Sequence, residues 1–136
     1  MTRQIKLTAQ FTFTDVAVTR SNDGNVGKHP INVPKLMASA WLDYAFADAA
    51  PGLSAGLGIR HIGARYSDDL NSVTTPAYTL LDAAVRYDTG PWRLALNVSN
   101  VTNKEHVATC LESAGGGNQC LYGQRRTAVL SAKYRF

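Results

Sequence analysis

The last ten residues, 127–136, read T-A-V-L-S-A-K-Y-R-F. Counting back from Phe136, every second residue is apolar, and the residues between them are mostly polar or cationic. Because successive strand residues point to opposite faces, this stretch predicts one strand with an apolar face and a polar face. A soluble sheet could show the same alternation. Two aromatics on the apolar face, Tyr134 and Phe136, favour a membrane barrel, in which such side chains lie at the lipid interface.

The composition suits a protein of strands and turns. Charged residues make up 18% of the 136 residues, which is below the roughly 25% of a typical soluble domain. No window holds about 18 consecutive apolar residues, so no transmembrane helix is predicted. The net charge of +4 is spread along the chain. Nucleic-acid binding needs a clustered basic face and is therefore not expected.

Two cysteines, Cys110 and Cys120, bracket the stretch L-E-S-A-G-G-G-N-Q. Neither lies at metal-ligand spacing from another Cys or His, so no metal site is predicted. A disulfide that closes a Gly-rich loop is the favoured interpretation and implies an oxidising compartment; two unpaired thiols are the alternative. No secretory signal follows Met1, and we therefore expect a piece cut from a longer precursor.

Six alternating stretches are predicted as strands, at about 5–14, 35–46, 53–67, 77–87, 92–100 and 121–136. Long polar loops at 21–34, 68–76 and 105–121 alternate with short turns at 47–52 and 88–91. Outer-membrane barrels have short periplasmic turns and longer external loops, which assigns each connection to a side. Six aromatics fall near the predicted periplasmic ends, as an interface girdle requires: Tyr44, Phe46, Tyr87, Trp92, Tyr134 and Phe136.

Five stretches carry a family resemblance. They are G-N-V-G-K-H-P-I-N-V-P-K with Trp41 and Tyr44 following, P-G-L-S-A-G-L-G-I-R-H-I-G-A-R-Y, P-A-Y-T-L-L-D-A-A-V-R-Y-D, W-R-L-A-L-N-V-S-N-V-T-N-K and Y-G-Q-R-R-T-A-V-L-S-A-K-Y-R-F. In this order they resemble the C-terminal part of a TonB-dependent ferric siderophore receptor of the ferrichrome type. One departure is His106, where the family often has an aromatic residue.

The resemblance implies a 22-stranded barrel plugged by an N-terminal domain. Residues 1–136 would form a single C-terminal segment of it without the plug, with an all-β fold: an antiparallel up-and-down meander of about six strands. The implied function is the binding and import of ferric siderophores across the bacterial outer membrane with energy from TonB. The ferric siderophore would be the transported ligand, and no covalently bound cofactor is expected. The segment alone is expected to transport nothing.

The resemblance also implies the partners. These are outer-membrane lipid, the remainder of the barrel and its plug, TonB through the N-terminal part, and the barrel-assembly machinery through the C-terminal strand. Leu130, Tyr134 and Phe136 are the candidate assembly signal. Tyr66 and Tyr122 are the candidate ligand contacts, because siderophore pockets in this family are often aromatic. The alternative is that both tyrosines belong to an outer aromatic girdle.

No nucleophile and base lie in a recognisable arrangement, so no enzymatic activity is expected. A second hypothesis is a small soluble binding module, lipocalin-like or a sandwich, in which Leu7, Leu57, Leu94 and Leu130 would be buried rather than in contact with lipid. A complete small barrel is excluded because single-chain barrels begin at eight strands. An isolated six-stranded segment has two unpaired edges and a large apolar face, and is expected to oligomerise or aggregate.

Overall fold

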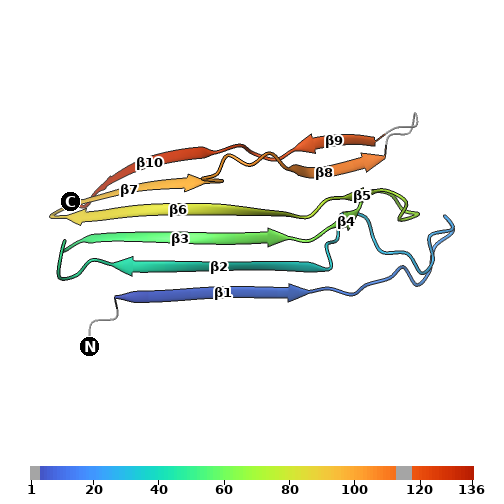
Figure 1. Ribbon diagram of the computed structural model, residues 1–136, viewed down its shortest axis with the longest axis horizontal. Coiled ribbons are helices and arrows are strands. Elements are labelled where there is room, and N and C mark those ends of the chain that lie inside the picture. The colour runs from blue at the N-terminus through green and yellow to red at the C-terminus, as the bar shows by residue number, and fades with distance from the viewer. Residues whose placement is uncertain (1–3, 113–117) are drawn as a thin grey trace.

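The computed structural model describes residues 4–112 and 118–136, and in these residues the chain is built of strands and their connections (Figure 1). The long strands are β1 (Ile5–Phe13), β2 (Leu36–Ala45), β3 (Leu53–Ile62), β6 (Tyr78–Thr89), β7 (Trp92–Ser99) and β10 (Thr127–Tyr134). The short strands are β4 (Arg65–Tyr66), β5 (Thr74–Thr75), β8 (Val107–Glu112) and β9 (Asn118–Tyr122). None of the described segments is a helix of the length and apolarity needed to cross a bilayer.

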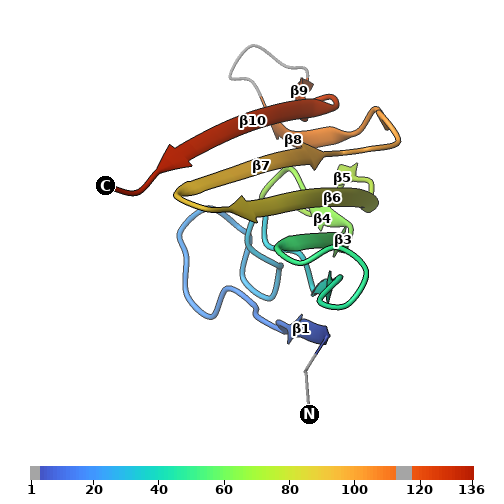
Figure 2. The ribbon, with the colours of Figure 1, turned by 90° about the vertical axis from the view of Figure 1, so that its left-hand side faces the viewer.

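The six long strands form one antiparallel sheet in the order β1-β2-β3-β6-β7-β10. Strands that neighbour one another in the sheet are therefore joined directly or through one small hairpin. The predicted all-β, up-and-down meander of about six strands is confirmed. The β4–β5 and β8–β9 hairpins lie beyond the same end of the sheet (Figure 1). Viewed along the strands, the sheet is a single twisted layer (Figure 2).

Two predicted strands are shorter than their alternation suggested. The stretch 53–67 breaks after Ile62, and Arg65–Tyr66 pairs with Thr74–Thr75 instead. The stretch 121–136 breaks at residues 123–126, so that its first residues belong to β9 and pair with β8. The predicted loop 105–121 is thus largely a hairpin, although its tip at 113–117 lies outside the described residues. The sequence pattern does not reveal these breaks, because the residues on both sides of each break alternate with the same period of two.

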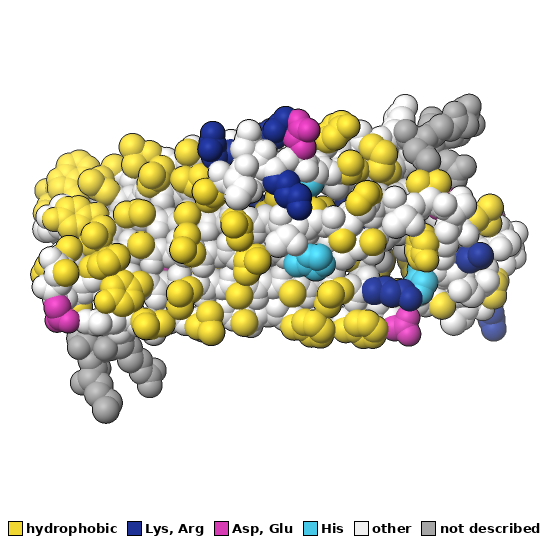
Figure 3. All heavy atoms as spheres, in the orientation of Figure 1, with side chains coloured by type: hydrophobic (Ala, Val, Ile, Leu, Met, Phe, Trp, Pro, Cys, Tyr) yellow, Lys and Arg dark blue, Asp and Glu magenta, His cyan; other side chains and the backbone are white. Residues whose placement is uncertain are grey.

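The register separates an apolar face from a polar face. Residues paired directly across neighbouring strands point to the same side. One row across all six strands is entirely apolar: Leu7, Leu42, Leu57, Ala83, Val98 and Ala128. The adjacent row on the other side is mixed and carries charge: Lys6, Asp43, Gly56, Ala84, Asn97 and Val129. Figure 3 shows apolar side chains spread over the length of the long strands.

Nothing in the described chain covers the apolar face. Leu7, Leu57 and Leu130 are 68%, 67% and 77% exposed, whereas the soluble-module hypothesis requires such leucines to be buried in a core. The accessible surface is 9503 Å², compared with roughly 6,900 Å² for a compact monomer of this mass. The hydrophobic stabilisation of this sheet must therefore come from a surface or a phase outside these residues.

Two glycines shape the short turns at the end of the sheet opposite the hairpins. Gly52 and Gly90 have φ angles of +88° and +53°, in the left-handed region that favours glycine. A Cβ on Gly52 would also collide with the backbone carbonyl of Asp88, whereas a Cβ on Gly90 would meet nothing within 4 Å. The two turns therefore differ in the space beside the backbone, although both need glycine for conformation.

We predict that Gly52→Ala lowers the free energy of unfolding more than Gly90→Ala does. Gly90→Ala incurs only backbone strain, about 1 kcal/mol, while Gly52→Ala adds displacement of a backbone atom, for a total of about 2 kcal/mol or more. Urea unfolding of the two variants in lipid vesicles measures the difference. Equal losses in the free energy of unfolding would show that the close approach of Gly52 to the Asp88 carbonyl makes no difference to stability.

Candidate functional site

Three arginine–aspartate pairs occupy the polar face. Arg60 Nε lies 2.8 Å from Asp82 Oδ2, Arg86 Nη1 lies 3.4 Å from Asp43 Oδ1, and Arg93 Nε lies 2.6 Å from Asp88 Oδ1. All six side chains keep part of their surface open to solvent, so each pair contributes little to stability. Their main effect is to place a negative side chain beside each of these positive ones, so that the charges within each pair balance.

Trp41 of β2 covers two glycines of β3 on the same polar face. A Cβ on Gly56 would lie 2.6 Å from Trp41 Cζ2, and a Cβ on Gly58 would enter the indole ring. Both glycines are buried beneath that ring. The absence of side chains at these two positions of β3 therefore lets a large neighbouring side chain lie close to the backbone.

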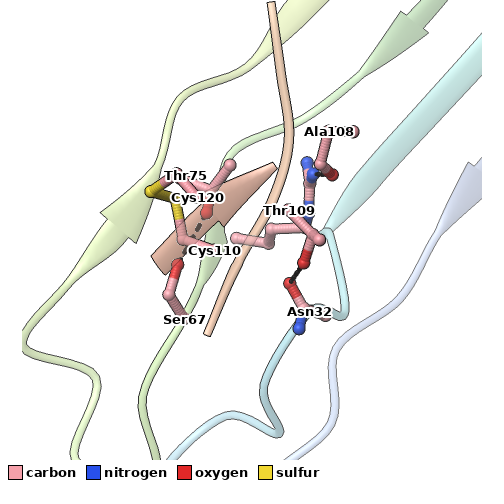
Figure 4. Close-up of a disulfide and its surroundings, with 8 residues drawn as sticks. Asn32, Ser67, Thr75, Ala108, Thr109, Cys110 and Cys120 are labelled. Atoms are coloured by element: carbon pink, nitrogen blue, oxygen red, sulfur yellow. Dashed lines mark hydrogen bonds between the residues drawn. A yellow bond between two sulfur atoms is a disulfide. The ribbon is translucent and has the colours of Figure 1, made fainter. Parts of the chain in front are cut away.

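The hairpin β8–β9 is held by the disulfide between Cys110 and Cys120, which confirms the favoured pairing (Figure 4). Cys110 is only 5% exposed. Figure 4 shows it beside Ser67 and Thr75, whose hydroxyl oxygens are 2.6 Å apart in a buried hydrogen bond. The disulfide is therefore part of a packed junction between the two hairpins.

Further hydrogen bonds join β8 to segments far away in the sequence. The Thr109 hydroxyl donates to Asn32 Oδ1 at 2.8 Å (Figure 4), and the Arg65 guanidinium donates to the Ala108 carbonyl. The backbone N–H of Asn32 in turn donates to the Tyr66 carbonyl at 2.8 Å. These contacts connect the 21–34 loop, β4 and β8 in one assembly beyond the end of the sheet.

Asp68 organises the β4–β5 turn. Its carboxylate accepts hydrogen bonds from the backbone N–H of Val73 at 2.7 Å and from the backbone N–H and hydroxyl of Ser72 at 2.9 and 2.8 Å. These donors, the N–H of Val73 above all, hold the pKa of Asp68 below its ordinary value despite the opposing effect of burial. The sequence analysis treated this stretch only as a polar loop.

Asn100 terminates β7 through a second compact network. It is 1% exposed, and its side-chain amide donates to the carbonyls of Lys104 and Gln124 at 2.8 and 3.2 Å. Its backbone N–H donates to Asp82 Oδ1 at 2.8 Å. Its positive φ of 52° is tolerated better by Asn than by most residues. The sequence analysis assigned Asn100 no role.

The two candidate ligand contacts lie in separate places. Tyr66 is half-buried in β4, stacks against His29 with ring centroids 6.0 Å apart, and lines a cavity of about 430 Å³. Tyr122 lies in β9 rather than at the start of the last long strand, is 76% exposed, and lines a smaller cavity of about 220 Å³ with His106. The structure thus does not bring the two rings into one pocket.

The candidate assembly residues lie at the edge of the sheet. Leu130 and Tyr134 belong to the apolar face of β10, and the Tyr134 ring packs edge-on against Trp92 and Phe136, with centroids 4.9 and 5.2 Å apart. This aromatic cluster lies at the end of the sheet with the short turns. In the residues that the structure describes, no three His, Cys, Asp or Glu side chains gather as metal ligands would.

Comparison with known proteins adds a family and a set of relatives. A family model described as "TonB dependent receptor-like, beta-barrel" matches residues 3–101. The ferrioxamine receptor of Yersinia enterocolitica is 35% identical over 140 residues, which cover 98% of this chain and 19% of that receptor. The ferrichrome outer membrane transporter/phage receptor of Escherichia coli K12 is 36% identical over 142 residues, covering 100% of this chain and 18% of the transporter.

Solved structures share the fold. The siderophore receptor PiuA from Acinetobacter baumannii matches with a TM-score of 0.78 and 25% identity, over 98% of this chain and 20% of PiuA. The unliganded ferric citrate transporter FecA matches with a TM-score of 0.82 and 20% identity, over 98% of this chain and 21% of FecA. The chain spans about a fifth of the length of the curated relatives it matches.

We predict that the β4–β5 turn loses protection in acid. Because the pKa of Asp68 is lowered in the folded state, its stabilisation is complete above the unfolded pKa of about 4 and is lost as the pH falls through the folded pKa. Hydrogen-exchange protection of the Ser72 and Val73 amides, corrected for intrinsic rates, should fall below about pH 4. Asp68→Asn should reduce this protection at pH 7, while Asp69→Asn, at an exposed neighbour, should not. Protection independent of pH in the parent protein would contradict the role of Asp68.

Proposed function

Because this chain belongs to the TonB-dependent receptor β-barrel family, we propose that it forms part of the wall of an outer-membrane receptor that imports ferric siderophores. The apolar face contacts lipid, and the polar face with its arginine–aspartate pairs lines the lumen. The hairpins and the 21–34 loop lie on the external side, and the short turns lie on the periplasmic side, as outer-membrane barrels are built.

The observation that carries this proposal is the unbroken apolar row on one side of six strands, of which no member is buried. Leu7, Leu57 and Leu130 remain more than two-thirds exposed, while the opposite side carries ion pairs and the Trp41 ring that covers two glycines. A soluble sheet has the opposite distribution of apolar side chains, with its leucines buried in a core. Alternation of lipid-facing and lumen-facing residues along each strand is the pattern of transmembrane barrels.

The relatives support a siderophore as the transported ligand. Their names specify ferrioxamine and ferrichrome, and both names describe iron complexes carried by whole receptors. In this proposal residues 1–136 form a single segment of the barrel, the remainder of the barrel and a plug complete the lumen, and TonB supplies energy through the plug. The iron is cargo within the siderophore, and the chain acts as a transporter component, with no catalysis of its own.

The last strand has a proposed role in assembly. Leu130, Tyr134 and Phe136 present one apolar, aromatic stripe on β10, whose outer edge is unpaired within the described residues. An unpaired edge is a template for another strand. We assign to this stripe the recognition by the barrel-assembly machinery, and to both sheet edges the pairing that closes the barrel. The same edges would drive oligomerisation of the isolated segment.

Tyr66 and Tyr122 remain the proposed siderophore contacts. Both lie among the external hairpins, where an incoming ligand first meets the receptor in this orientation. Tyr122 has the more open ring, at 76% exposure, and its neighbour His106 packs against Tyr78 with centroids 4.3 Å apart. This aromatic group offers stacking surface to a ligand, while the Tyr66 ring is already stacked against His29.

We predict that two adjacent positions of β7 differ in their tolerance of an arginine side chain. Leu96→Arg, on the apolar face near the middle of the strand, should lower the free energy of unfolding in lipid vesicles by about 2–4 kcal/mol. Asn97→Arg, on the polar face, should cost far less because its side chain enters the lumen. Urea unfolding of the complete receptor in vesicles compares the two. Similar losses at both positions would overturn the assignment of the faces.

We predict that Tyr122→Ala weakens binding of ferric ferrioxamine or ferric ferrichrome to the complete receptor by about tenfold, as expected for loss of an aromatic contact. Tyr66→Ala tests the second proposed contact in the same titration. Tyr87→Ala, on the apolar face at the other end of the sheet, is the control and should leave the affinity unchanged. An unchanged affinity after either test substitution would remove that tyrosine from the site.

A further inference from the structure

Within the described part of the chain, strand β9 pairs only with β8. The two strands form a separate two-stranded sheet beside the six-stranded one. Their ladder shifts register between Val107 and Thr109, and Leu121 and Tyr122 of β9 are 63% and 76% exposed. Because an isolated two-stranded hairpin is at best marginally stable in water, backbone pairing alone holds β9 weakly.

Strand β8 is anchored independently of β9. The Thr109 hydroxyl donates to Asn32 Oδ1 at 2.8 Å, and the Ala108 carbonyl accepts a hydrogen bond from the Arg65 guanidinium. Cys110 is buried in the junction with the β4–β5 hairpin (Figure 4). These contacts join β8 to two other segments of the chain, so β8 does not need β9 to stay in place.

The disulfide connects the anchored strand to the weakly held one. Cys110 and Cys120 lie directly opposite each other in the ladder and are bonded to each other. Cys110 is buried, whereas Cys120 is exposed. Because the rate of thiol–disulfide exchange depends on which sulfur a thiolate can reach, the sulfur of Cys120 is the point of attack and Cys110 is the leaving group.

We propose that this disulfide is a thiol-sensitive switch that regulates siderophore recognition through Tyr122, with small dithiols as the class of reductant. A thiolate attacks the Cys120 sulfur, forms a mixed disulfide there and releases Cys110 as a thiolate, which takes a proton from water. The second thiol of the dithiol then attacks the reagent's own sulfur in the mixed disulfide. Cys120 leaves as a thiolate and is protonated, the dithiol becomes a cyclic disulfide, and two electrons pass to the protein.

Reduction would leave β8 in place and loosen β9. Tyr122 follows Cys120 by two residues on the same strand, and it pairs with Val107 beside the register shift. Without the cross-link, the Tyr122 ring would be held less firmly beside His106, with which it lines the cavity of about 220 Å³. A contact residue that must first be ordered binds its ligand less tightly, so reduction lowers the affinity for the siderophore.

The effect on affinity rests on the proposed siderophore function, whereas the effect on β9 does not. The test uses the complete receptor that contains this chain, in neutral detergent, with dithiothreitol as the dithiol. We expect reduction without denaturant and a loss of hydrogen-exchange protection of about tenfold or more at the β9 amides, with no loss in β6 or β7. The affinity for ferric ferrichrome or ferric ferrioxamine should fall by about three- to tenfold.

Two kinds of variant separate this switch from a general loss of structure. The double variant Cys110→Ala with Cys120→Ala should bind siderophore as weakly as the reduced parent and should not respond to dithiothreitol, which accounts for any other cysteines in the receptor. Tyr122→Ala should remove the effect of reduction on affinity, while Tyr87→Ala, at the other end of the sheet, should preserve it. Thermal unfolding of each variant verifies that the fold is retained.

The site of attack is identified with glutathione, a monothiol. Mass spectrometry of the receptor after brief exposure to glutathione should find the mixed disulfide on Cys120 and the free thiol on Cys110. Glutathione on Cys110 would overturn the proposal, as would a disulfide that dithiothreitol reduces only after denaturation.

Two further results would also overturn the proposal. Unchanged protection of the β9 amides after reduction would show that backbone pairing holds β9 without the disulfide. Unchanged siderophore affinity in the reduced receptor would show that the disulfide does not regulate recognition. If the oxidised receptor binds no ferric siderophore, the proposed function fails, and hydrogen exchange and glutathione labelling still decide whether the disulfide controls β9.

Discussion

Backbone hydrogen bonding between neighbouring strands in one fixed register is the constraint on which the rest of this structure depends. Because paired residues share a face, the pairing of Leu7 with Leu42 and of Leu42 with Leu57 keeps one side of the sheet apolar. A slip of one residue would bring charged groups such as Lys6 to that side. In hydrocarbon such a slip would be costly, since neither charges nor unpaired backbone groups can reach water. The membrane assigned to the apolar face would therefore enforce the same register that creates this face.

The sequence was sufficient to predict the long strands, because a period of two is local information. The C-terminal stretch that alternates most clearly forms β10, Thr127–Tyr134, and its aromatics cluster with Trp92 as a girdle would. The family resemblance is confirmed by the match of residues 3–101. The two short hairpins could not be predicted in the same way. Their contacts join residues such as Thr109 and Asn32, which are 77 positions apart, and no periodicity records a pairing at that distance.

The candidate site was predicted less completely than the fold for a related reason. Aromatic residues such as Tyr66 and Tyr122 can be selected from sequence by type, but their burial and their separation into two cavities depend on how the hairpins pack. Buried polar residues were even harder to identify from the sequence. Asn100 and Asp68 resemble ordinary turn residues in the sequence, and only their partners show that each holds a connection in place. Small polar side chains bind their own backbone in turns of many kinds, so residue type alone does not distinguish an exposed turn from a buried one.

The two ends of the sheet are built on different physical principles, and this difference suits the proposed import of ferric siderophores. At one end, turns such as that around Gly90 connect strands directly and leave little chain free to interact with a ligand. At the other end, a disulfide and long-range hydrogen bonds join hairpins that the sheet itself does not hold. Residues that recognise a ligand must be fixed relative to one another, and loops become rigid only through such additional bonds. In the proposed orientation, the external end can therefore vary in sequence while its geometry stays fixed, and the strands beneath it would be constrained by lipid on one side and by the lumen on the other.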